Sequence, residues 1–415
     1  MTITRRTFIG AAAATIAARP AQGFASYQPL SSVAAALEPL STNVQVPADR
    51  FDPWIELDAS AIAHNVGQIT RLTGERPILA VLKNNAYGLG LQLVAKMLEP
   101  IAAIDGFAVV RADEAIALRD AGITKPVLLM ALVATRDVTE LVERDISLAI
   151  FADGDAARLA AAAGGRAPIL AHFYVDTGMS RMGVPYHRAL PIMQETQTNS
   201  AIRVVGTFTT LTEETDFDRE QLERFTTLVA EATNAGVATG RQHVASSNGV
   251  YHVPEAHLDL VRPGIAIYGA YPSRPEEERA KAALRLACRL RARVVRTQLL
   301  RAGDTVGYGR RYVAAQPAWI ATLPIGHADG YPGRASNGAK VLISSQLYGV
   351  IAVTASHTVI EVGAEERVRV GDTATLLGPD DPSIEPNTVA TAIGVSAYDL
   401  LMHMREGLPR FILQG

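Results

Sequence analysis

The feature of this sequence that most constrains its fold is a regular alternation of short apolar runs with helical patterns. The segments between the runs show the spacing of amphipathic helices, as in Arg219–Ala235. Eight runs, each bounded by polar residues or glycine, are Ile78–Leu82, Gly106–Val110, Val127–Met130, Leu148–Phe151, Ile169–Val175, Val204–Thr209, His243–Ser246 and Asp259–Val261. This α/β pattern predicts parallel βαβ units, and eight strands close a (β/α)8 TIM-type barrel. An open doubly wound sheet is the alternative, but no G-x-G-x-x-G follows the first run.

The pattern changes near residue 285, where β-rich runs separated by turn clusters replace the alternation. No long helical period returns before Tyr398–Arg405. We therefore expect a barrel over 54–284 that begins with a strand at Trp54–Leu57 and a helix capped by Asp58, followed by a C-terminal all-β domain over 285–415. The β-rich runs are Arg291–Gln298, Trp319–Pro324, Lys340–Ser344, Val350–Ala355 and Thr358–Val362.

The first 25 residues have the parts of an export signal. Arg5 and Arg6 precede an aromatic residue, an alanine-rich apolar stretch and small residues. This order resembles a twin-arginine signal, so we expect residues 1–25 to be such a signal, 26–53 to be a linker and the mature chain to be periplasmic. An alanine-rich N-terminal helix on a cytoplasmic protein is the alternative. The apolar stretch is too short to span a bilayer, so we expect no membrane anchor.

Composition excludes several classes of protein. Hydrophobic residues make up 48% and charged residues 20% of the 415 residues, which is typical of a globular chain and excludes a disordered one. The formal net charge of −3 gives no support for binding nucleic acid. The one cysteine, Cys288, excludes a disulfide framework within the chain, and we expect no metal site.

A lysine stands at the end of the first of the eight runs, at the mouth where barrel active sites are built. Its apolar surroundings would lower the pKa of the ammonium group, as a nucleophilic lysine requires. The pattern Lys83-x-x-Ala86-Tyr87-Gly88, after an apolar strand and ahead of a β domain, strongly resembles the alanine racemase family. Members of that family are pyridoxal phosphate enzymes, and the resemblance implies that Lys83 holds the cofactor as a Schiff base.

Further segments resemble the family's motifs in the family's order, over roughly Trp54 to Arg410. They are the segments 175–183, 246–248, 261–269, 306–309 and 397–399. The resemblance implies that Arg181 faces the substrate carboxylate, Ser247 and the backbone of Gly264 and Ile265 contact the phosphate, Tyr87 and Tyr398 help to hold it, Arg262 meets the pyridine nitrogen, and Tyr308 is the second catalytic residue.

The implied roles are chemically consistent. Arg262 would keep the pyridine nitrogen unprotonated, because a guanidinium does not give up its proton. The ring is then a weaker electron sink, which limits side reactions such as transamination. Racemisation needs one proton-transfer group on each face of the α-carbon, and Lys83 and Tyr308 would supply them, the family placing the lysine on the D face. The ordinary pKa of tyrosine is about 10, so a nearby cation must lower it, and Arg181 is the candidate.

Four positions on the substrate side depart from the family's pattern. Tyr174 stands where alanine-specific members carry a carbamylated lysine, and Thr210 stands where they carry the histidine that partners the catalytic tyrosine. His327 replaces a tyrosine near the pocket entrance, and either relays protons in its place or is structural. Ala355 replaces a methionine that lines the wall against the substrate, within a segment that also loses an aspartate. Smaller and less charged walls admit larger side chains, so we expect broad specificity.

The sequence therefore predicts a periplasmic, pyridoxal phosphate-dependent amino-acid racemase that interconverts L- and D-alanine and other amino acids. One alternative is a related barrel decarboxylase, which requires an acidic partner for the pyridine nitrogen and a cysteine acid in the β domain. Another is a non-catalytic pyridoxal phosphate-binding protein that has lost its proton-transfer groups. The resemblance also implies a homodimer in which Tyr308 acts on the active site of the partner subunit.

Overall fold

The eight apolar runs form a closed parallel barrel. The computed structural model describes residues 46–47, 49–165 and 168–413, so the expected export signal and most of the linker lie outside the described residues. The strands are hydrogen-bonded in the order β2 (Ile78–Val81), β3 (Ile104–Val109), β4 (Val127–Leu129), β5 (Ile146–Ile150), β6 (Ile169–Asp176), β8 (Ile202–Phe208) and β9 (Arg241–His243), and the two-residue β7 (Val184–Pro185) pairs with β6.

The eighth run closes the barrel as an extended segment rather than a full strand. Val261 forms a parallel bridge with Ile78, and Arg262 forms one with Ser246. The N–H of Leu79 donates to the carbonyl of Val261 over 2.9 Å, and the N–H of Arg262 donates to that of Ala245 over 2.8 Å. The expected (β/α)8 barrel is thereby confirmed.

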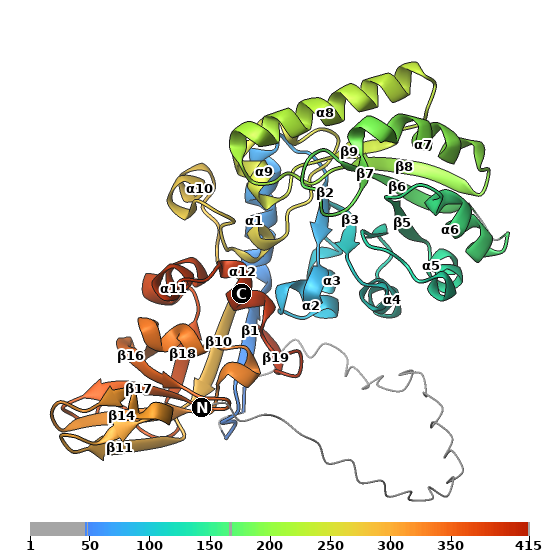
Figure 1. Cartoon of the computed structure of the whole chain (residues 1–415). Coiled ribbons are helices and arrows are strands. Elements are labelled where there is room, and N and C mark those ends of the chain that lie inside the picture. Colours follow the sequence, from blue (N-terminus) through green and yellow to red (C-terminus); the bar gives the residue numbers. More distant parts are fainter. Residues whose placement is uncertain (1–45, 48, 166–167, 414–415) are drawn as a thin grey trace, which may run out of the picture. The chain divides into compact units, whose positions relative to one another are not determined.

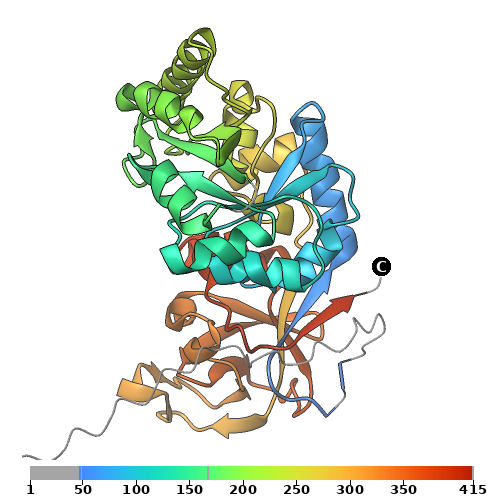
Figure 2. The ribbon, with the colours of Figure 1, turned by 90° about the vertical axis from the view of Figure 1, so that its right-hand side faces the viewer.

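Helices surround the barrel strands on the outside, as Figures 1 and 2 show. Asp58 caps the first of them as expected, because its carboxylate accepts from the N–H of Ala61 over 3.0 Å. The helices are α1 (Ala59–Leu72), α3 (Leu91–Leu98), α4 (Ala112–Asp120), α5 (Val138–Glu143), α6 (Asp155–Ala163), α7 (Tyr186–Thr198), α8 (Thr215–Asn234), α9 (Ser247–His252) and α10 (Pro275–Lys281).

The C-terminal part is built on a second sheet, so the expected β domain is also confirmed. Its strand order is β11-β14-β17-β16-β15-β18-β10-β1-β19, and a small hairpin, β12 (Thr305–Val306) with β13 (Tyr312–Val313), stands beside it. The strands that follow the barrel are β10 (Cys288–Arg293), β11 (Arg296–Leu300), β14 (Ala318–Leu323), β15 (Lys340–Ile343), β16 (Gln346–Val353), β17 (Thr358–Gly363), β18 (Thr373–Leu377) and β19 (Arg410–Leu413).

Two elements differ from the expectation. The strand β1 (Trp54–Asp58) was expected to open the barrel, but it lies in the second sheet, antiparallel to β10 and parallel to β19. Its partners come more than 200 residues later, so sequence order does not reveal the pairing. Helix α11 (Pro386–Ile393) precedes the expected α12 (Ala397–Met402), and its eight residues are too few for a clear helical period.

One cluster of buried apolar side chains runs through both parts of the chain. It includes Ile55 of β1, the barrel strands, and Leu400 and Leu401 of α12. A smaller cluster lies beneath the β12–β13 hairpin. Because the core is shared, α12 of the C-terminal part is packed against the barrel and brings its own side chains to the barrel mouth. Within the described ranges, no helix has the length and hydropathy needed to cross a membrane.

Candidate active site

Lys83 begins a left-handed turn directly after strand β2. The turn is the element α2 (Lys83–Tyr87), in which Asn84, Asn85, Ala86 and Tyr87 all have φ between 52° and 56°. Asparagine tolerates this conformation, but alanine and tyrosine do so only at a cost of about 1–2 kcal/mol per residue. The carboxylate of Glu114 compensates in part by accepting from the N–H of Asn85 over 3.0 Å. The turn therefore holds the lysine rigidly at the strand end.

The surroundings of Lys83 favour a neutral amine. Burial, and then the charge of Arg181, lower the pKa of Lys83. The carboxylates of Glu213 and Glu114 act in the opposite direction but do not outweigh these two effects. The Nζ atom lies 5.9 Å from the ring centre of Tyr87 and has no hydrogen-bond partner within the described part of the chain. An amine with a lowered pKa and no hydrogen-bond partner is suited to covalent bonding with a carbonyl compound.

A second group of residues forms a polar cradle near the last barrel segments. The N–H groups of Gly264 and Ala266 donate to Ser247 Oγ over 2.9 and 3.3 Å. Because both lone pairs of this hydroxyl are engaged, its hydrogen remains free to donate to an anion. The rings of Tyr87 and Tyr398 lie 6.1 Å apart beside it, and neither hydroxyl bonds to a described residue.

Gly264 is required by this packing. A Cβ at Gly264 would collide with the hydroxyl oxygen of Tyr87 and lie 2.7 Å from its Cζ. Burial raises the pKa of Tyr87 and of Tyr398, so both hydroxyls stay protonated and serve as donors. Together with Ser247, the cradle presents hydroxyl donors to an anion, which fits a phosphate group.

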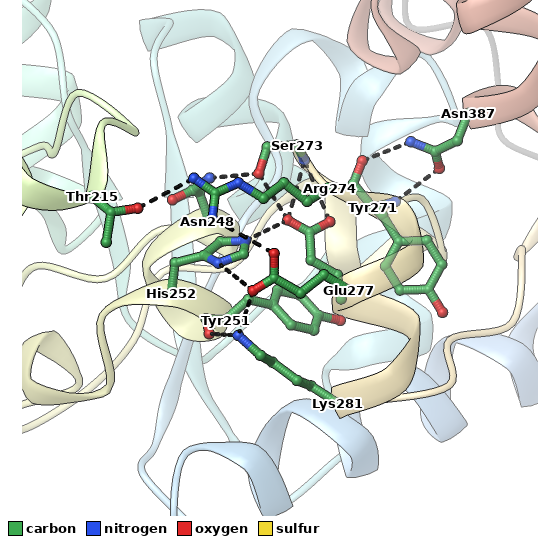
Figure 3. Close-up of polar contacts among 11 residues, drawn as sticks. Thr215, Asn248, Tyr251, His252, Tyr271, Ser273, Arg274, Glu277, Lys281 and Asn387 are labelled. Carbon is green, nitrogen blue, oxygen red and sulfur yellow. Dashed lines mark hydrogen bonds and ion pairs between the residues drawn. The ribbon is translucent and has the colours of Figure 1, made fainter.

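The short helix α9 that carries Ser247 is fixed by a buried polar network with α10. Glu278 is fully buried and accepts from Ser273 Oγ and His252 Nε2, both at 2.8 Å. Asn248 donates to Ser273 over 2.9 Å, and Lys281 donates to the carbonyl of Tyr251 over 3.0 Å. Figure 3 shows these contacts joining one helix to the other. Three of these four bonds join α9 to residues 273–281, so the network holds the helix that carries Ser247.

The guanidinium of Arg262 is buried with one donor left unpaired. Its NH1 donates to His243 Nδ1 over 2.9 Å and to the His243 carbonyl, and its NH2 donates to the carbonyls of Thr209 and Val244 over 2.6 and 3.2 Å. Arginine has five N–H donors, and the fifth, on Nε, has no acceptor among the described residues. Burial lowers the pKa of Arg262 to about 10, so it remains a cation at neutral pH. An unpaired cationic donor suits an unprotonated ring nitrogen.

Two of the four positions that depart from the expected pattern, Tyr174 and Thr210, form a hydrogen-bonded pair. Tyr174 is buried, its hydroxyl lies 2.9 Å from Thr210 Oγ1, and its ring stacks on Phe208 with 4.3 Å between centroids. Arg181 is exposed nearby in the loop after β6, makes no ion pair with any described residue, and acts electrostatically on Lys83. Its charge is therefore available to an anionic ligand.

Two predicted site residues lie apart from this constellation. Tyr308 is 87% exposed in the segment that joins β12 to β13, and Ala355 is exposed in the loop after β16. The carbonyl of Ala355 accepts from the N–H of Ala328, next to the exposed His327. No contact joins these residues to Lys83 within the described chain. The structure thus brings together Lys83, Tyr87, Ser247, Arg262, Gly264, Ile265 and Tyr398, and leaves Tyr308, Ala355 and His327 on an exposed face.

Sequence reasoning missed several residues around the site. His243 was treated only as part of an apolar run, and Glu114, Glu213 and Glu278 were not singled out. His243 occupies the C-terminal end of a barrel strand, as Lys83 does, and that position was the available signal. Glu278 has no comparable signal in the sequence, because it lies on a helix and not at the end of a barrel strand. No cluster of His, Cys, Asp and Glu able to hold a metal ion occurs in the described ranges.

Comparison with protein-family models gives two matches that together span the barrel and the sheet. The N-terminal domain of alanine racemase matches residues 57–272, and its C-terminal domain matches residues 287–412. Among curated relatives, the alanine racemase of Carboxydothermus hydrogenoformans is 34% identical over 370 residues, covering 86% of this chain and 98% of the relative. That of Geobacter sp. is 35% identical over 363 residues, covering 84% and 94%.

Solved structures give the same result. The alanine racemase of Bacillus anthracis with bound L-Ala-P has a TM-score of 0.81 at 29% identity, covering 89% of this chain and 97% of its own. The alanine racemase of Streptomyces lavendulae, a D-cycloserine producer, has a TM-score of 0.81 at 27% identity, covering 89% and 98%. The similarity therefore extends over the whole described fold.

Proposed function

Since the chain belongs to the alanine racemase family, we propose that it interconverts L- and D-alanine with pyridoxal phosphate bound at Lys83. The observation that carries this proposal is the convergence of three unpaired groups on one barrel mouth. They are Lys83 Nζ, the Nε–H of Arg262, and the hydroxyls of the cradle around Ser247. A covalent amine, a ring-nitrogen donor and a phosphate cradle are the three contacts this cofactor needs.

The residues would divide the work as follows. Bound pyridoxal phosphate acts as an electron sink that stabilises negative charge at the α-carbon. Arg262 holds the ring nitrogen unprotonated, and Arg181 binds the substrate carboxylate. Lys83 moves a proton on one face of the α-carbon, and Tyr308 of the partner subunit moves one on the other. Because Arg262 remains a cation and does not give up its proton, it would leave the ring nitrogen unprotonated, which favours racemisation over transamination.

A spectroscopic and kinetic comparison tests this function. Purified chain and a Lys83→Ala variant are titrated with pyridoxal phosphate, reduced with borohydride and assayed for racemisation of L-alanine. We expect the reduced cofactor on Lys83 of the unaltered chain, with turnover, and neither in the variant. Full racemase activity in Lys83→Ala would refute the proposal. Cofactor trapping without turnover on any amino acid would instead support the non-catalytic binding protein. The decarboxylase is disfavoured because Arg262, not an acid, is placed for the ring nitrogen.

We also propose a homodimer with shared active sites. The exposed Tyr308 supports this, because a tyrosine that must reach a reacting carbon is 87% exposed here and has no contact with Lys83 among the described residues. Mixing Lys83→Ala with Tyr308→Phe chains tests it. Each mixed dimer would contain one site with both groups intact, so activity should recover to roughly a quarter of the wild-type value. Two inactive variants that stay inactive on mixing would contradict shared sites.

Broad specificity is a further part of the proposal. The uncharged Tyr174–Thr210 pair and the small Ala355 are the supporting observations. A hydrophobic wall discriminates one methylene by only about 1–3 kcal/mol, and a smaller wall by less. Restoring bulk with Ala355→Met should lower kcat/KM for larger amino acids relative to alanine. An unchanged ratio would place the selectivity elsewhere.

We propose a periplasmic location from the residues before position 26, which lie outside the described structure. The supporting feature is the Arg5-Arg6 pair ahead of an alanine-rich stretch. Cell fractionation of the full chain and of an Arg5→Lys/Arg6→Lys variant tests it. Export of the first and retention of the second are expected, and equal distribution of both would contradict it.

A further inference from the structure

Two histidines, the half-buried His172 and the buried His243, continue the hydrogen-bond chain behind Arg262. His172, on β6, places its Nδ1 2.8 Å from Nε2 of His243, and the two rings meet edge to face with 5.0 Å between centroids. His243 in turn places its Nδ1 2.9 Å from NH1 of Arg262. The result is a linear arrangement from His172 through His243 to the guanidinium.

The direction of each hydrogen bond follows from the arginine. Arginine only donates, so His243 Nδ1 must be an acceptor and carries no proton. A neutral His243 then bears its proton on Nε2, and that N–H donates to His172 Nδ1. Burial, and then the charges of Arg262 and Arg241, lower the pKa of His172 to about 3 and hold that of His243 well below its usual value. Both rings are therefore neutral at working pH.

We propose that His172 is a positioning residue for the reaction: by accepting from His243 Nε2 it fixes the tautomer that accepts from Arg262, and so keeps the unpaired Nε–H of the guanidinium aimed at the cofactor's ring nitrogen. This inference rests on the proposed function. Among the described residues, His172 makes no hydrogen bond to the guanidinium or to the cradle, so it acts only through His243.

The surrounding structure is built to hold this arrangement. Gly206 lies opposite His172 in the β6–β8 ladder, and a Cβ there would collide with His172 Nδ1 and lie 2.7 Å from its Cε1. Phe208 stacks on His243 with 5.0 Å between centroids and an interplanar angle of 10°, and the Arg262 guanidinium lies 5.1 Å from the same ring centre. Glycine makes room for one histidine and Phe208 fixes the plane of the other.

Loss of His172 has a specific chemical consequence. Without an acceptor at Nε2, His243 is free to adopt the other tautomer, in which an Nδ1–H faces the N–H groups of Arg262. The Nδ1–H of His243 and the N–H groups of Arg262 then repel each other, because both are donors. The guanidinium would move away, and its Nε–H would no longer reach the ring nitrogen. A ring nitrogen without that donor is open to protonation by water, which strengthens the electron sink and increases transamination. The expected effect is thus on reaction choice as well as on rate.

Three variants test the inference. His172→Leu removes the acceptor at similar size, and His172→Asn keeps an amide oxygen near the position of Nδ1. His187→Leu, on the exposed surface of α7, is the matched control. The ratio of transamination to racemisation is measured for each, and ¹⁵N spectra of histidine-labelled wild-type chain, with and without cofactor, report which nitrogen of His243 carries the proton.

We expect the proton of His243 to be on Nε2. We also expect the ratio of transamination to racemisation to rise roughly tenfold in His172→Leu alone, because loss of the hydrogen bond from the charged Arg262 has an effect of about this size. A folding defect lowers both reactions equally and leaves the ratio unchanged. A wild-type ratio in folded His172→Leu, or a proton on Nδ1 of His243, overturns the inference. If His172→Leu does not fold, two measurements still test the inference. They are the tautomer of His243 in the wild-type chain and a wild-type ratio of the two reactions in His172→Asn. Absence of all racemisation in the wild type would count against the proposed function, while the tautomer would still test His172.

Discussion

Replacing Gly264 with alanine should damage cofactor binding through one steric contact. The added Cβ would strike the Tyr87 hydroxyl and lie 2.7 Å from Cζ, against an optimal carbon separation of about 3.5–4.0 Å. The Tyr87 ring must then move by about 1 Å, yet it is 3% exposed and packed against Tyr268 and Tyr398. Gly264 has φ −124°, outside the left-handed region, and the contact with Tyr87 is the steric effect that the added Cβ introduces.

The magnitude has two parts. Overpacking of this kind costs about 1–3 kcal/mol of unfolding free energy. Moving the Tyr87 hydroxyl out of reach of the phosphate would remove a hydrogen bond to a charged group, which contributes about 1.5–3 kcal/mol to binding. The Kd for pyridoxal phosphate should therefore rise by roughly 10- to 150-fold. The assay is spectroscopic titration of cofactor-free chain, with denaturant unfolding alongside.

Two further variants separate the parts. Gly349→Ala lies in β16, where nothing is within 4 Å of the added Cβ, and should leave both quantities unchanged. Adding Tyr87→Phe to Gly264→Ala removes the clashing oxygen, so stability should recover in part while the weak binding persists. Wild-type stability and affinity in Gly264→Ala would refute the reasoning.

Four other substitutions test charges, a helix cap and the α9–α10 network. Burial lowers the pKa of Lys83; in addition, the charge of Arg181 lowers it and that of Glu213 raises it. Glu213→Gln should therefore shift the pH dependence of cofactor uptake to lower pH, and Arg181→Gln should shift it to higher pH. Shifts in the same direction for both variants would contradict this reasoning. Burial raises the pKa of Asp58, but hydrogen bonds at the helix start outweigh it and lower that pKa. Asp58→Ala should therefore cost about 1 kcal/mol at pH 7, and this difference, measured by urea unfolding, should vanish as pH falls below the folded-state value; a difference independent of pH would rule out the cap. Glu278→Gln should cost about 1–3 kcal/mol and weaken cofactor binding, as unfolding and titration would show, and unchanged values would mean that the α9–α10 network does not position Ser247.

The barrel was predictable because its signal is local and repeated. Most of the barrel strands are largely buried, so they appear in the sequence as short apolar runs bounded by polar residues. The pairing of β1 with β10 was not predictable in this way, because a strand's own composition does not identify a partner more than 200 residues away. The left-handed turn at α2 was also hidden, since Ala86 and Tyr87 are not residues that favour positive φ. Tertiary contacts, including that from Glu114, impose it.

The candidate site was predictable to the extent that it lies in contiguous motifs. Lys83, Arg262 and Ser247 each stand in a short run that resembles the family's, and the structure places them at one mouth. His172 and His243 form no motif, because they meet only when β6 and β9 are brought together around the barrel. Their role emerges from hydrogen-bond direction, which depends on distances between side chains that the sequence does not contain.

The substitutions on the substrate side share one physical consequence. Tyr174 and Thr210 satisfy each other through a 2.9 Å hydrogen bond, so neither offers a charge to Arg181 or to a catalytic tyrosine. Tyr174 stacks on Phe208, which also stacks on His243. The neutral Tyr174–Thr210 pair therefore packs against the same aromatic rings that support Arg262. Arg181 has no anionic partner among the described residues, which is consistent with its proposed role in binding the substrate carboxylate. If Arg181 binds the substrate carboxylate as proposed, it does not select among side chains, because that carboxylate is common to all amino acids. The proposed broad specificity then depends on the small Ala355.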